Sequence, residues 1–265
     1  MSWKRFKQQL QLILIAFEME MKQNFTDAFI IFGILVQPLI IAFLALWMLK
    51  GTTSDYAIFV AVGSGMTGLW TTLLFNSGNS ITGERWTGTL ENLVAAPVPM
   101  RIVVFGKNLA DITQALLSVV VCYALISIIL GYPLDIAHPF LFIISTILTI
   151  FSFVCFGLII STAFILNPDV QRFQNGLEFP IYILAGFLFP ITVLPGWTAP
   201  LSYLLTPYWA AVALHGSTSI GMPLDQIYFS WLMMIVFGLI YLFASEFLFR
   251  KVLFKARVDA TLNIQ

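Results

Sequence analysis

The sequence carries very little charge for its length. Only 10% of its 265 residues are Asp, Glu, Lys or Arg, whereas 59% are hydrophobic, and the 13 basic and 13 acidic residues cancel to a net charge of zero. So few charged side chains cannot coat a water-soluble globule of this size, and lipid must therefore solvate much of the chain. With no basic face in the sequence, we expect no nucleic-acid partner.

Residues for metal, nucleotide and covalent chemistry are equally scarce. The two histidines, His138 and His215, are expected in outer loops without His or Cys neighbours, so no metal site is predicted. Gly106-Lys107 lacks the preceding glycine and the following Ser or Thr of a phosphate-binding loop. Cys122 and Cys155 fall inside apolar runs and are interpreted as small core residues. We expect no catalytic residue, no enzymatic activity and no cofactor bound by this chain itself.

Long apolar stretches instead predict an all-α membrane protein with six transmembrane helices. Each stretch has about the 20 residues that a spanning helix needs. An amphipathic helix, lying in the membrane plane from Ser2 to about Asn24, is predicted before them. The chain is thus interpreted as one domain, 1–265, with an interfacial helix at 1–27, six spans within 28–249 and a cytoplasmic tail at 250–265. The predicted spans are Ala28 to Leu49 with a kink at Pro38, Tyr56 to about Phe75, Ile112 to Leu130, Phe140 to Leu166, about Leu177 to Leu194, and Ile227 to Phe249.

The stretch from Pro195 to Asp225 decides the number of spans. It is largely apolar, but four prolines interrupt it. Counting it as a seventh span would place the basic cluster from Arg250 to Arg257 outside the cell, against the positive-inside rule. With six spans and both termini in the cytoplasm, every basic residue except Lys50 is inside, which is 12 of 13. We therefore expect short re-entrant helices here, dipping into the outer leaflet without crossing it.

The longest polar interruption runs from Thr82 to Pro99, in the predicted inner loop between the second and third spans. Thr87 or Thr89 can cap a short helix there, and Pro97 ends it after about two turns. A short amphipathic helix in such a loop either floats at the lipid interface or docks onto a protein partner, and the residue pattern alone leaves both alternatives open.

This loop also resembles a known signature. The run Gly-Glu-Arg-x-x-Gly-Thr-Leu-Glu-x-Leu-x-x-x-Pro, from Gly83 to Pro97, is similar to the motif after the second span in permease subunits of ABC-2 type ABC transporters. Leu194-Pro195-Gly196-Trp197, followed by Pro207, resembles that family's element before the last span. The resemblance implies a multi-pass permease of an ATP-driven exporter in a bacterial inner membrane. It further implies two ABC ATP-binding subunits as partners, which use ATP and Mg, and a second permease, identical or related.

Carried over by position, the resemblance assigns a coupling helix that contacts the ATP-binding subunit. Glycines would let the backbone approach the partner, and charged residues would fix the register of the contact. For Glu84 and Arg85 the alternative is a solvated ion pair without a partner. The candidate coupling residues, with Trp86 or Leu90 as the apolar anchor, are Gly83, Glu84, Arg85, Trp86, Gly88, Thr89, Leu90, Glu91, Leu93 and Pro97.

The resemblance also implies a substrate path along the second and fifth spans. An aromatic, otherwise apolar path suits a hydrophobic or amphipathic compound such as a drug, a lipid or a lipid-linked glycan. Asp111 and Glu178 are expected to snorkel to the cytoplasmic interface rather than act on substrate or protons. The principal alternative function is a non-transporting immunity or sensory protein with the same fold. The candidate path residues are Phe75, Asn76, Asn79, Phe179, Tyr182 and Phe187.

Overall fold

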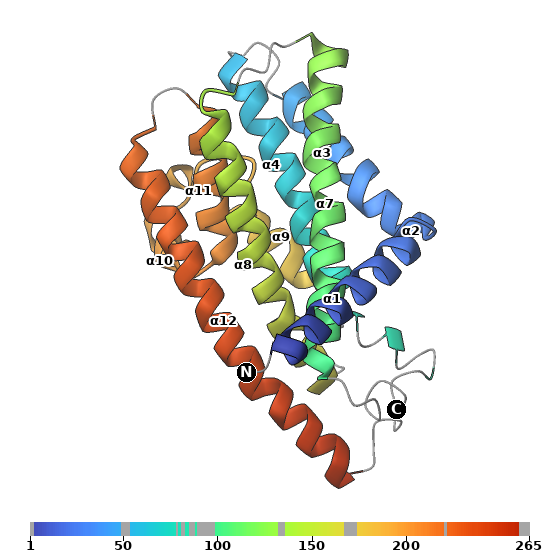
Figure 1. Ribbon diagram of the computed structural model, residues 1–265. Coiled ribbons are helices and arrows are strands. Elements are labelled where there is room, and N and C mark those ends of the chain that lie inside the picture. The colour runs from blue at the N-terminus through green and yellow to red at the C-terminus, as the bar shows by residue number, and fades with distance from the viewer. Residues whose placement is uncertain are drawn as a thin grey trace.

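The structure is a computed structural model, and it describes residues 3–48, 54–77, 79–80, 83–84, 88, 99–131, 136–166, 174–219 and 222–259. All the elements in these ranges are helices, and no strand occurs among them. Long helices run side by side as a bundle, and α1 lies across one end of α7 (Figure 1). The all-α prediction is confirmed for the described part of the chain.

The predicted interfacial helix is α1, Trp3–Asn24. Its packing face is a stripe of Ala16, Glu20 and Asn24, which are buried four residues apart on one side of the helix. Gly106 allows the close approach to α7, because a Cβ at that position would lie 2.7 Å from the carbonyl oxygen of Ile13. Apolar side chains on the opposite side stay exposed, as a helix lying in lipid requires. These exposed side chains are Leu10, Leu14, Ile15 and Met19.

The predicted first span is a helix in three parts. It consists of α2 (Ala28–Ile31), the π-helical turn η1 (Phe32–Val36) and α3 (Gln37–Met48). The Gln37 N–H donates to the carbonyl of Phe32, five residues back. Pro38 would clash with a carbonyl four residues back in a regular α-helix, and the wider π turn comes just before it. The irregularity near the kink predicted at Pro38 is therefore a π-helical turn that ends at Val36, just before Gln37 and the proline.

The next three predicted spans are long helices. They are α4 (Ser54–Thr72) continued by a second π-helical turn, η2 (Leu73–Ser77), then α7 (Met100–Leu130) and α8 (Pro139–Leu166). At Gly131 the backbone is left-handed, with φ 65°, which ends α7 where the sequence predicted. α4 packs closely on α7 at Gly65, where a Cβ would lie 2.6 Å from the Cα of Val119.

The predicted fifth span, about Leu177 to Leu194, is not one continuous helix. α9 (Gln174–Leu184) has 11 residues and ends where the chain turns through Gly186, whose φ is 69°. Three short helices follow, η4 (Ile191–Val193), η5 (Gly196–Thr198) and α10 (Ala199–Tyr203). α11 (Thr206–Thr218) then packs, almost entirely buried, against α4, α8 and α12. Left-handed Gly186 and then Pro190 and Pro195 prevent the helix from continuing.

The last predicted span is α12, Leu224–Asp259, which extends the helix ten residues past Phe249 into the predicted tail. Within the described ranges, four helices are long and apolar enough to cross a membrane: Tyr56–Ser77, Met100–Ile128, Pro139–Phe164 and Leu224–Lys251. α3 contributes a shorter apolar stretch, Gln37–Trp47. The six-span arrangement stays a prediction, because the predicted first span is a helix divided into three parts and the predicted fifth span contains only the short helix α9.

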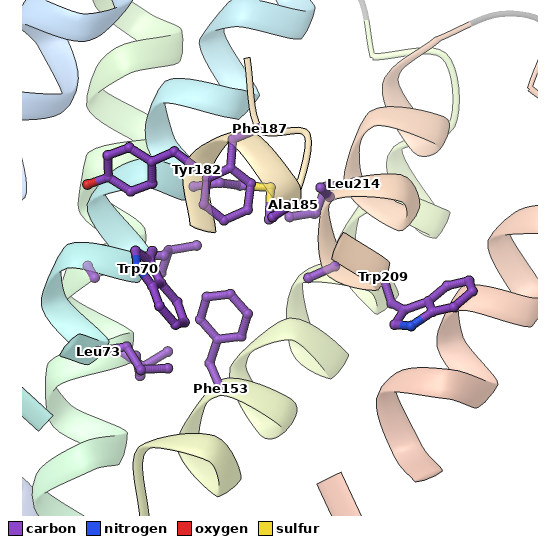
Figure 2. Packing of buried hydrophobic residues seen from close by; sticks show 14 of the residues in the cluster. Trp70, Leu73, Phe153, Tyr182, Ala185, Phe187, Trp209 and Leu214 are labelled. Carbon is purple, nitrogen blue, oxygen red and sulfur yellow. The ribbon is translucent and has the colours of Figure 1, made fainter. Parts of the chain in front are cut away.

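The core lies where α4, α8, α9 and α11 meet. Trp70, Leu73, Phe153 and Phe187 are almost fully buried in it, and Figure 2 shows them grouped in the centre. Trp209 lies apart from this group in the same view, and its ring packs instead against Phe229 of α12. Cys155 is buried in the bundle, as predicted, whereas the side chain of Cys122 is outside the described part.

Candidate functional site

The motif of the predicted inner loop is described at three positions, Gly83, Glu84 and Gly88. Gly88 has a φ of 71°, a left-handed conformation that explains the choice of glycine there. Glu84 is partly buried, and its carboxylate faces the bundle. The coupling helix and the other candidate coupling residues lie outside the described residues; these are Arg85, Trp86, Thr89, Leu90, Glu91, Leu93 and Pro97.

Glu84 is tied to two helices through one lysine. Lys107 of α7 places its Nζ 2.7 Å from Oε1 of Glu84 and 3.1 Å from Oε2 of Glu20 on α1. The side chains are mostly buried, with exposed fractions of 14% for Lys107, 10% for Glu20 and 25% for Glu84. Buried charges need partners, and each carboxylate here has the same ammonium. We call these three residues the Lys107 bridge, and it joins the motif loop, α1 and α7. A solvated ion pair, the alternative for Glu84, does not fit this burial.

Asp111 lies one helical turn beyond Lys107 and is fully buried. Asn24 of α1 donates to its Oδ1 at 2.7 Å, and Ser77, the last residue of η2, donates to its Oδ2 at 3.0 Å. Ser161 of α8 in turn donates to the carbonyl of Ser77. The expectation that Asp111 snorkels to the interface is wrong, because donors from two other elements satisfy its carboxylate inside the bundle.

Glu178 of α9 forms a second buried cluster, with only 6% of the residue exposed. Three donors meet at its Oε1: Tyr182 Oη at 2.7 Å, Thr71 Oγ1 at 2.8 Å and Gln37 Nε2 at 3.1 Å. They come from α9, α4 and the start of α3. Snorkelling is therefore wrong for Glu178 too. The cluster fixes α9 against the first two predicted spans, as a three-way hydrogen-bonded junction.

The candidate path residues do not share one surface. Asn79 and Tyr182 do lie between the predicted second and fifth spans: Asn79 exchanges hydrogen bonds with Gln174, and Tyr182 contacts Thr71 at 2.6 Å. Phe187 is 0% exposed within the core, whereas Phe179 is 58% exposed on the outside of α9. Phe75 and Asn76 are half-buried in η2. The two predicted spans thus meet as expected, and the roles of these residues stay predictions.

Several of these contacts were missed by the sequence reasoning. Glu20 and Asn24 belong to the buried stripe of α1 with Ala16, and the four-residue spacing of these three residues was the signal that could have indicated it. Gln37 stood out as a polar residue in an apolar stretch, but nothing in the sequence indicated Glu178 as its partner. His215 is also corrected: it is buried in α11, not placed in a loop, and contacts the carbonyl of Phe187 at 3.1 Å. Among the described residues, no group of three or more His, Cys, Asp or Glu is arranged to hold a metal.

Comparison with known proteins adds one finding to this geometry. The model of the family described as ABC-2 type transporter matches residues 11–218, which is well over half of the chain. The match covers the second half of α1, the motif loop, the Lys107 bridge, both buried carboxylates and α11. No curated protein matches the sequence.

Proposed function

Because the chain belongs to the ABC-2 type transporter family, we propose that it is the permease subunit of an ATP-driven exporter. Two ATP-binding subunits would supply the energy, and a second permease, identical or related, would complete the translocation unit. The compound proposed is hydrophobic or amphipathic, a drug, a lipid or a lipid-linked glycan, moved outward across a bacterial inner membrane.

The Lys107 bridge is the observation that carries this proposal. An ATP-binding partner docked on the loop from Gly83 to Pro97 would push or pull Glu84. Through Lys107, that displacement would reach α7 and, through Glu20, α1 as well. A loop that only floated at the lipid interface would need no mostly buried ion pair to α7, because its charges would lie in water.

The proposed topology has six passes and cytoplasmic termini. Charge supports it, since 12 of the 13 basic residues are on the inner side in that arrangement. The nearly complete burial of α11 supports re-entrant helices between α9 and α12, since irregular backbone at membrane depth is tolerated only where protein shields it.

The test is affinity purification of the chain in mild detergent, followed by mass spectrometry and by ATPase and transport assays in proteoliposomes. We expect a subunit with a Walker A loop to copurify. Glu84→Gln should lower transport per ATP hydrolysed by about tenfold, the order of a coupling free energy between sites of 1–3 kcal/mol. Glu18→Gln is the matched control, because Glu18 pairs with Lys22 on the exposed side of α1 with 67% of its side chain exposed.

Two results would argue against the proposal. Recovery of the chain without any ATP-binding subunit would favour the non-transporting immunity or sensory protein. Equal transport per ATP hydrolysed in Glu84→Gln and Glu18→Gln would leave the family membership unchanged. It would show, however, that the Lys107 bridge does not transmit movement from the loop to α7 and α1.

A further inference from the structure

A large cavity lies away from both buried clusters, between α10, α11 and α12. Its volume is about 740 Å³, within the range of small-molecule sites. Aromatic rings from all three helices line it: Tyr203 from α10, Trp209 from α11 and Phe229 from α12. None of the candidate coupling or path residues that the structure describes belongs to its wall.

The aromatic wall is a set of rings in contact with one another and mostly presents ring surfaces. The Trp209 ring lies 5.9 Å from Tyr203, 5.0 Å from Tyr208 and 5.4 Å from Phe229, measured between ring centroids. Its indole N–H already donates to the carbonyl of Tyr203 at 2.9 Å, so it is not available to an occupant. The wall thus offers aromatic contact area, the property that attracts apolar groups and cations.

A carboxylate closes one end of this wall. Asp225, in the first turn of α12, is exposed and lines the cavity. In the part of the chain that the structure describes, no ion pair includes Asp225. A carboxylate in a first helical turn also stabilises its own helix. Here, however, Phe229 lies one turn further along the same face, so a group beside the carboxylate also meets an aromatic ring.

Polarity changes along the cavity in the direction of α12. Asp225 is in the first turn of the candidate span Leu224–Lys251, so in the proposed topology it lies near a membrane boundary. Met233, at the other end of the lining, is eight residues away, about 12 Å along a helix. In that topology the cavity has an anionic rim near the boundary and a largely aromatic and apolar wall beyond it.

We infer that this cavity binds cationic amphiphiles, with an organic ammonium head between Asp225 and Phe229 and an apolar body along Tyr203 and Trp209. The observations are the carboxylate of Asp225, which no ion pair among the described residues includes, the aromatic wall and the graded polarity. The ammonium can come from a lipid headgroup or from a soluble amine that enters the membrane. Binding needs no ATP and no partner subunit, so the inference succeeds or fails independently of the proposed export.

The experiment is an isothermal titration calorimetry measurement, in which hexyltrimethylammonium is titrated into the purified full-length chain in a non-ionic detergent. 1-Hexanol, which has the same alkyl chain without the charge, is the ligand control. We expect Asp225→Asn and Phe229→Leu each to raise the Kd for hexyltrimethylammonium about two- to fivefold, the size of one exposed charge or cation–π contact. Asp225→Glu should restore the affinity.

Tyr228→Leu is the matched protein control. Tyr228 is as exposed as Phe229, at 50% against 52%, but it packs against Trp231 and does not line the cavity. Its variant should bind like the wild type. The inference is overturned if Asp225→Asn and Phe229→Leu also bind like the wild type, or if 1-hexanol binds as tightly as the cation.

Competition then identifies the source of the ammonium. Displacement of the probe by dihexanoyl phosphatidylcholine supports a lipid headgroup as the occupant. Failure of this lipid to displace a probe that still depends on Asp225 supports the same site with a soluble amine as its ligand.

Discussion

Replacing Lys107 by Met is the sharpest test of the bridge between the motif loop, α1 and α7. Methionine keeps an unbranched side chain of similar length and has good helix propensity, so α7 itself should be unaffected. The ammonium is lost, however, and with it the cation 2.7 Å from Glu84 and 3.1 Å from Glu20. Two largely buried carboxylates then lose the positive charge between them.

The expected cost follows from burial. Removing one partner of a fully buried ion pair costs about 3–5 kcal/mol, whereas an exposed pair is worth about 0–1 kcal/mol. With side chains that are 14%, 10% and 25% exposed, the bridge is close to the buried limit, and we expect a loss of about 3 kcal/mol in the free energy of unfolding. For a chain of this size, this corresponds to a fall in Tm of roughly 6–12 °C.

The assay is thermal unfolding of the purified chain in detergent, followed by intrinsic tryptophan fluorescence. Lys107→Arg keeps the charge and should lose less than half as much stability. Lys22→Met removes the exposed pair with Glu18, where 75% of the Lys22 side chain is exposed, and should change Tm by no more than about 2 °C. A double-mutant cycle of Lys107→Met with Glu84→Gln should give a coupling energy of about 1–3 kcal/mol. Equal Tm values for Lys107→Met and Lys22→Met, or a coupling energy near zero, would refute the reasoning.

Three further predictions test the packing, the second cluster and the topology. Gly65→Ala should destabilise the chain by about 1–3 kcal/mol, because its methyl group would overlap the α7 backbone, while Gly196→Ala, with nothing within 4 Å, should be nearly neutral in the same melt. Tyr182→Phe removes one of the donors to buried Glu178 and should cost about 1–3 kcal/mol; an unchanged Tm would show that the bond is dispensable. A single cysteine in place of exposed His138, in a background free of the native cysteines, should react with an impermeant thiol reagent on intact cells; reaction only after lysis would contradict the proposed orientation.

The sequence predicted best what depends on local patterns. The apolar run predicted as the fourth span became α8 with nearly the expected bounds, since length and hydropathy are properties of one segment. α7 ends at Leu130 as predicted but begins at Met100, well before the expected Ile112, because its first three turns carry polar residues. Small residues on α4 indicated close packing, and Gly65 provides it against α7. The break in the predicted fifth span is also local, but its sequence signal is weaker. Gly186 turns the chain after α9 because its backbone is left-handed, and a single glycine in an apolar run does not indicate the sign of its φ.

The polar clusters could not be predicted in the same way, because their partners are distant in sequence. Asn24 and Asp111 are 87 residues apart, and Gln37 and Glu178 are 141 apart. Each carboxylate is near the end of a predicted span, where snorkelling is the usual outcome for an isolated charge. Only the packing of α1 on α7, and of α9 on α4, brings in the donors that make burial more favourable than exposure.

The two π turns connect these clusters to the first two predicted spans. Gln37 directly follows η1 and donates to Glu178, and Ser77 ends η2 and donates to Asp111. A π turn inserts one residue, which rotates the following side chains by about 100° relative to a regular α-helix. Without η1 and η2, the same two donors would point to other faces of their helices, and both carboxylates would be buried with fewer partners. The π turns thus place the donors that the two buried carboxylates need. The apolar periodicity of the sequence indicates neither the turns nor these distant partners.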